Sequence, residues 1–177
     1  MLASITNRIN NLIKSMQYTI MPAINPDDSM AQEQAALLVG HLKVINQQWD
    51  KAFLFELGTL KGLLAATEEI LREKSSQSGK TAKALDDVAT SLAETKAATC
   101  KTAMQTSDFV HKIGLAIERL LDASEIDGTD AFKSRLQNII LDYSEKQSGR
   151  ERIWNQFYNL DPDREKFPTI DEMLGLV

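Results

Sequence analysis

A chain of 177 residues is long enough to bury a substantial core and has the usual length of a single domain. Its net charge of −5 opposes nonspecific binding to nucleic acid and to anionic membrane surfaces. No stretch has the length and apolar character of a membrane span, and the first residues hold no apolar run typical of a signal peptide. The single cysteine, Cys100, cannot form an internal disulfide, which fits a reducing compartment. We therefore expect a cytoplasmic protein that binds neither nucleic acid nor membranes.

The first two predicted helices are a short one over residues 3–21 and a very long one over residues 26–75. Isoleucine and methionine recur on one face of the first, and Pro22 is expected to end it. For the second, Asn25 is the expected N-cap, and Pro26 followed by two aspartates suits the first turn of a helix. Apolar residues then recur three or four apart as far as residue 71, which predicts a buried seam. Fifty helical residues span roughly 75 Å, so we expect either an elongated molecule or a bend near Gly58.

Three further helices are predicted, over residues 81–123, 130–159 and 170–176. A polar segment in which Gly79 can adopt a left-handed conformation precedes the first of these. Thr169 and Glu172 have the spacing of a capping box at the start of the last. The expected fold is all-α, an elongated antiparallel four-helix bundle with a short C-terminal helix, in a single domain over residues 1–177.

A stretch of small side chains interrupts the predicted helix 81–123 between residues 95 and 107. If helices 26–75 and 81–123 form one antiparallel hairpin, this stretch lies beside the aromatic residues of the long helix. Large side chains against small ones usually pack tightly, but the same arrangement can leave a pocket for a small apolar ligand. The residues expected to line such a pocket are Trp49, Phe53, Phe55, Thr99, Cys100 and Ala103.

Motifs for catalysis and cofactor binding are missing from the sequence, and no cofactor is expected. The glycines form no phosphate-binding loop, there is no GxSxG motif, and neither histidine follows a glutamate by three residues as a di-iron bundle requires. One metal hypothesis is open, because the same hairpin would place His41 level with His111, and Asp108 lies three residues before His111. A polar contact or an exposed position is the more ordinary role for these three residues.

The long helix also carries apolar residues outside its main seam, and the C-terminal region mixes arginines with aromatic residues. A helix that is apolar around most of its circumference must be covered on most of it, and a second copy of the chain could supply that cover. The residues predicted for such an interface are Leu37, Val44, Leu54, Leu63, Ile70, Arg150, Arg152 and Tyr158.

The leading functional hypothesis is a non-enzymatic helical bundle that acts through protein–protein contacts, as an oligomeric accessory or scaffold protein. The expected oligomer is a homodimer, with another protein as a possible partner. The alternative is a bundle that binds a small apolar ligand between its second and third helices. A metal-dependent enzyme is the third hypothesis.

Overall fold

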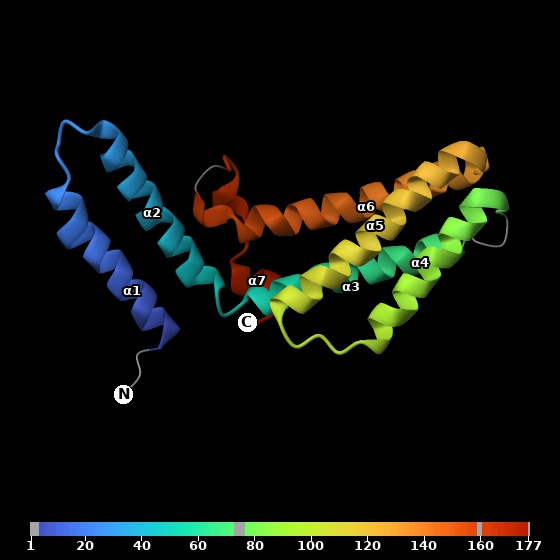
Figure 1. The fold of residues 1–177 in the computed structure, drawn as a ribbon, viewed down its shortest axis with the longest axis horizontal. Coiled ribbons are helices and arrows are strands. Elements are labelled where there is room, and N and C mark those ends of the chain that lie inside the picture. The colour runs from blue at the N-terminus through green and yellow to red at the C-terminus, as the bar shows by residue number, and fades with distance from the viewer. Residues whose placement is uncertain (1–3, 73–76, 159–160, 177) are drawn as a thin grey trace. The chain divides into compact units, whose positions relative to one another are not determined.

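The computed structural model describes residues 4–72, 77–158 and 161–176, and throughout these ranges the regular structure is helical, without strands (Figure 1). The predicted all-α class is thus confirmed. Among the described helices, none is long and apolar enough to cross a bilayer. Contacts between residues divide the chain into two compact units. We call residues 1–51 with 152–168 the hairpin unit, and residues 52–151 with 169–177 the core unit.

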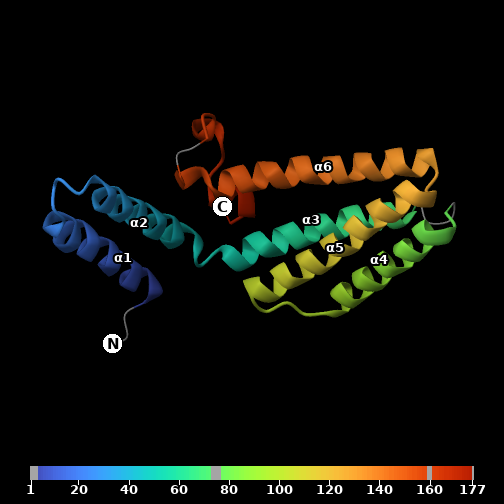
Figure 2. The same cartoon turned by 45° about the horizontal axis from the view of Figure 1, so that its top comes forward.

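In the hairpin unit, two helices lie side by side in both views (Figures 1 and 2). They are α1 (Ile5–Ser15), which continues through a π turn (Met16–Ile20) and a 3₁₀ turn (Met21–Ala23), and α2 (Ser29–Gln48). Across their interface, Asn46 Nδ2 donates to Asn10 Oδ1 over 3.1 Å. The unit also contains the 3₁₀ turns η4 (Gln156–Tyr158) and η5 (Arg164–Lys166). Residue 3, the predicted first residue of the first helix, lies outside the described residues.

The start of α2 differs from the prediction by three residues. Asp28 is the N-cap, and its Oδ1 accepts from the backbone N–H of Ala31 over 3.0 Å. Asn25 instead accepts from the N–H of Asp27 and so closes a local turn. Both residues satisfy backbone donors, but only Asp28 does so at the helix itself.

The predicted helix 26–75 is in fact two helices, and its last residue lies outside the described range. α2 ends at Gln48, a turn follows over residues 49–51, and α3 runs over Ala52–Arg72. The break is therefore at Trp49 and not at Gly58, which lies inside α3. Neither glycine nor proline marks it, and Gln48 Nε2 donates to the carbonyl of Trp154 over 2.7 Å. Tertiary contacts of this kind, and not local propensity, account for the end of α2.

The core unit consists of α3, α4 (Gly79–Ala97), α5 (Ala103–Asp127), most of α6 (Asp130–Trp154) and the short α7 (Ile170–Leu174). Its hydrophobic core draws on α3, α4, α5 and α6, and the side chains of Leu85, Val88, Ile113 and Leu120 are completely buried. Ion pairs join neighbouring helices at the rim, among them Lys96 with Glu68 at 2.5 Å.

The predicted helix 81–123 is also two helices, α4 and α5, which fold back on each other. Residues 98–102 form the link, and Thr102 is the N-cap of α5, accepting from the N–H of Gln105 over 3.1 Å. The Gln105 side chain in turn accepts from the N–H of Lys101. As a result α5 runs in the same direction as α3, whereas α4 and α6 run antiparallel to it (Figures 1 and 2). The stretch of small residues is therefore where the chain reverses.

The predicted helix 3–21 is α-helical only as far as Ser15, and Pro22 lies inside the 3₁₀ turn Met21–Ala23 and does not end the helical segment. Two local predictions at helix starts are confirmed. Gly79 has a φ of 62°, in the left-handed region, as predicted. Thr169 and Glu172 form the predicted capping box at the start of α7. Thr129 caps α6, whose helix ends at Trp154 and is followed by η4, so the predicted helix 130–159 stops early; residue 159 itself lies outside the described residues.

Candidate functional site

Exposed apolar side chains are concentrated in the hairpin unit. Of the seventeen large hydrophobic residues that are exposed in the described part of the chain, eleven belong to this unit. They are Ile5, Leu12, Tyr18, Ile20, Met30, Leu37, Leu38, Ile45, Trp49, Phe157 and Tyr158. Of the twenty buried hydrophobic residues the hairpin unit holds only four: Ile9, Ala35, Val39 and Val44. The unit thus exposes more large apolar side chains than it buries.

Part of this surface is hollowed into an apolar groove of about 660 Å³, which we call the α2 groove. It lies between α2 and η4, and its lining residues are Glu33, Ala36, Leu37, Gly40, His41, Val44, Phe157 and Tyr158. The rings of His41 and Tyr158 meet edge to face with their centroids 5.7 Å apart. At Gly40 a Cβ would meet no atom within 4 Å, so the groove is open to solvent there.

Polar contacts hold the wall that carries Phe157 and Tyr158. Gln156 Nε2 donates to the carbonyls of Ile153 and Pro168 over 2.9 and 3.3 Å. Arg152 Nε donates to Asp161 over 2.7 Å, and its guanidinium lies 4.9 Å from the centroid of the Phe167 ring. The hydrogen bond from Arg152 lowers the pKa of the Asp161 carboxyl. The aromatic wall is therefore part of a folded segment within the same unit.

The two units differ in net charge as well as in the number of exposed apolar side chains. The hairpin unit contains seven basic and seven acidic residues, so the whole net charge of −5 belongs to the core unit. Self-repulsion consequently opposes contacts between core units of two copies, whereas it does not oppose contacts between hairpin units.

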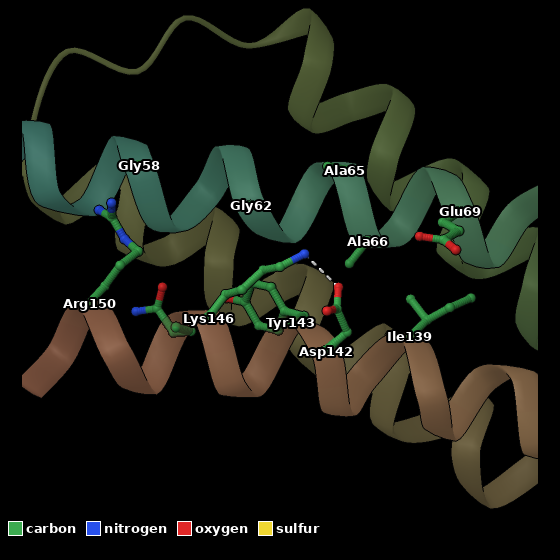
Figure 3. Close-up of a pocket in the computed structure, with 11 residues that line it drawn as sticks. Gly58, Gly62, Ala65, Ala66, Glu69, Ile139, Asp142, Tyr143, Lys146 and Arg150 are labelled. Carbon is green, nitrogen blue, oxygen red and sulfur yellow. Dashed lines mark hydrogen bonds and ion pairs between the residues drawn. The ribbon is translucent and has the colours of Figure 1, made fainter. Parts of the chain in front are cut away.

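A second cavity, of about 210 Å³, lies in the core unit between α3 and α6 (Figure 3). On the α3 side small residues leave the space, among them Gly58, Gly62 and Ala65. On the α6 side lie polar residues, and Lys146 pairs with Asp142 over 2.7 Å along the rim.

Arg150 closes one end of this cavity by lying across α3. Its Nη2 donates to the carbonyl of Phe55 over 3.1 Å, and its Cζ lies 5.3 Å from the centroid of the Phe55 ring. The guanidinium fits because position 58 is glycine; a Cβ there would approach Cζ of Arg150 to 2.9 Å. Burial lowers the pKa of Arg150, and burial together with the nearby Glu151 raises the pKa of Tyr143. These contacts hold α6 against α3. The cavity is a packing defect between the two helices, with polar residues at its rim.

The six residues predicted for a ligand pocket line neither of these two cavities. Trp49 belongs to the hairpin unit and the other five to the core unit. Phe55 is buried beneath Arg150, while Thr99 and Cys100 lie in the link between α4 and α5, where Cys100 packs against the core. The hairpin that was predicted to place these residues side by side does not form, because the prediction assumed that residues 81–123 are one helix.

The three residues of the metal hypothesis are also divided between the units. His41 lines the α2 groove, whereas Asp108 and His111 are exposed on α5. Within the described ranges, no group of three or more His, Cys, Asp or Glu side chains is arranged to hold a metal ion.

The predicted interface residues have three kinds of environment. Leu37, Val44 and Tyr158 line the α2 groove. Leu54 is exposed on α3, whereas Leu63 and Ile70 are buried in the core and cannot contribute to an interface of the folded chain. The arginines Arg150 and Arg152 make the intramolecular contacts described above.

The sequence interpretation missed two features, of which only the first has a recognisable signal in the sequence. Thr102 and Gln105 have the capping-box spacing, which marks the start of α5. Phe157 falls within the predicted helix 130–159, but it is exposed by 42% and lines the groove. The apolar periodicity does not indicate that Phe157 is exposed, because α6 ends three residues before it.

No family model, curated protein or solved structure matches this chain. The functional argument therefore depends on the chain's own residues.

Proposed function

We propose that this protein is a non-enzymatic accessory or scaffold protein of the cytoplasm. It acts through protein–protein contacts made by the hairpin unit, and the first of these contacts is with a second copy of the chain in a homodimer. The observation that carries the proposal is the excess of exposed over buried large apolar side chains in a unit without net charge. In the core unit we propose the elongated antiparallel four-helix bundle of α3 to α6, with α7 as the short C-terminal helix, as the scaffold that carries this surface.

The magnitude of the apolar surface supports association. Covering the exposed half of a leucine or isoleucine side chain contributes roughly 1 kcal/mol. Association costs roughly 4–15 kcal/mol in lost freedom, which several such side chains together can offset. Covering all eleven exposed residues of the hairpin unit would contribute roughly 11 kcal/mol, which is comparable to that cost, whereas the six on the larger core unit are scattered over α3, α5, α6 and the C-terminal end.

The test is the oligomeric state of the wild-type chain and of two leucine variants. Leu37→Glu places a charge in the α2 groove, and Leu141→Glu places the same charge at an exposed leucine of the core unit. We expect light scattering to show a wild-type dimer, a Leu37→Glu monomer and a Leu141→Glu dimer. A wild-type monomer at about 100 μM, a concentration at which even weak dimers form, would contradict the homodimer.

A second candidate function is the binding of a small apolar ligand. Its support is the volume of the α2 groove, which lies within the range of roughly 300–1,000 Å³ typical of ligand sites. A fluorescent apolar probe separates the two functions: if the groove is an interface, probe binding decreases as the protein concentration rises and the dimer forms.

A further inference from the structure

A short stripe of exposed residues lies along one edge of α1, beside the buried Ile9. Ile5, Arg8 and Leu12 are three and four residues apart and therefore lie on one side of the helix. The side chains of Ile5 and Leu12 remain 52% and 55% exposed although α1 packs against α2. The two apolar side chains are seven residues apart, which in a helix is about 10 Å.

The α2 groove offers a site of the same length. Along α2 the groove is lined from Glu33 to Val44; within it Leu37 and Val44 are also seven residues apart on one face of α2, and Gly40 leaves the space between them open. A helix with two apolar side chains two turns apart can therefore place both of them along the groove, as in other complexes in which a helix lies in a groove.

Charge complements this fit. Between residues 4 and 26 the chain has two basic residues, Arg8 and Lys14, and no acidic one. Between residues 27 and 42 it has three acidic residues, Asp27, Asp28 and Glu33, and no basic one. Of these residues, Arg8 lies on the α1 stripe and Glu33 lines the α2 groove, so the two surfaces each carry one charge of opposite sign.

We propose that the stripe of α1 in one copy docks in the α2 groove of a second copy, and that the second copy docks its α1 in the groove of the first. Because each chain carries both surfaces, a two-fold axis produces two identical contacts and closes the assembly as a dimer. This inference rests on the proposed homodimer and adds which surfaces form it.

The test exchanges the charges between the two surfaces. One variant, Arg8→Glu with Lys14→Glu, makes the α1 segment negative; the other, Asp27→Lys with Glu33→Lys, makes the beginning of α2 positive. Asp28 is retained because it caps α2. Each variant alone places like charges at both contacts, so we expect its dimer to dissociate at least about tenfold more readily than the wild type.

Mixing the two variants restores opposite charges at both contacts. We expect sedimentation velocity to show a heterodimer with an affinity near that of the wild-type dimer. At 1 M salt the Debye length is about 3 Å, so the attraction between the two charged surfaces is screened and the heterodimer should form less readily. Two variants that dimerise as well as the wild type, or a mixture that remains monomeric while both chains retain their helical circular dichroism, would overturn the inference.

An apolar substitution provides a second test that does not depend on charge. Leu12→Glu should yield a monomer, whereas Leu141→Glu should remain a dimer. If the wild type is a dimer, and Leu37→Glu disrupts it but Leu12→Glu does not, the docking of α1 is wrong and the proposed homodimer stands. A wild-type monomer would reject the proposed function itself.

Discussion

The contact between Arg150 and α3 can be tested with two glycine-to-alanine substitutions one turn apart. Gly58 lies beneath the guanidinium of Arg150, and a Cβ at that position would come within 2.9 Å of Cζ. Gly62 lies on the same face of α3, but a Cβ there would make an ordinary contact of 3.5 Å with Tyr143 Cε2. Both substitutions gain about 1 kcal/mol from the greater helix propensity of alanine. The difference between the two variants therefore isolates the Arg150 contact.

The magnitude follows from what Arg150 loses when it is displaced. A hydrogen bond from a charged donor contributes roughly 1.5–3 kcal/mol, and a cation–π contact at an exposed site roughly 0.5–1 kcal/mol. Because Arg150 is only partly buried, we take the lower ends, a loss of about 2 kcal/mol. Gly58→Ala should then lower the free energy of unfolding by about 1 kcal/mol, and Gly62→Ala should raise it by about 1 kcal/mol.

Urea unfolding followed by circular dichroism measures this difference, with unchanged slopes as the check on two-state behaviour. The Arg150→Ala background supplies the control, because without the guanidinium Gly58→Ala should become as stabilising as Gly62→Ala. Equal stability of Gly58→Ala and Gly62→Ala in the wild-type background would show that Arg150 moves aside without cost.

Two further predictions concern helix ends in the core unit. Asp127, at the end of α5, accepts hydrogen bonds from the side chain of Thr81 and from the backbone N–H groups of Lys80 and Thr81, and these lower its pKa. The contribution of Asp127 to the free energy of unfolding is therefore complete above the ordinary aspartate pKa of about 3.9, and it is lost as the pH falls through the lower pKa of the folded state. In Asp127→Asn the urea midpoint should fall less steeply below about pH 4 than in the wild type. An unchanged pH profile would contradict this role. Thr102→Ala should cost about 1 kcal/mol through the loss of the α5 cap, whereas the exposed Thr90, which caps no helix, should tolerate alanine in the same unfolding assay.

Helix content and several helix starts followed from local chemistry. Leucine and isoleucine at intervals of three and four residues require a helix wherever the chain is to bury them, and Thr169 with Glu172 fixes a helix start through bonds within four residues. Gly79 was predictable for the same kind of reason, since a left-handed φ favours the residue that lacks a Cβ. These features need no knowledge of what lies across the fold.

The break after Gln48, and with it the α2 groove, is decided by tertiary structure, whereas the break after Ala97 has a local signal in the cap at Thr102. Helical periodicity continues across residues 49–51 without glycine or proline, so the end of α2 depends on contacts such as the one between Gln48 and Trp154, which are 106 residues apart. The direction of α5 depends on the reversal between α4 and α5, and the burial of Ile70 and the exposure of Phe157 depend on how the helices pack within each unit. A periodic pattern states which side chains share a face of a helix; only the packing of the helices decides whether that face meets the core or the solvent.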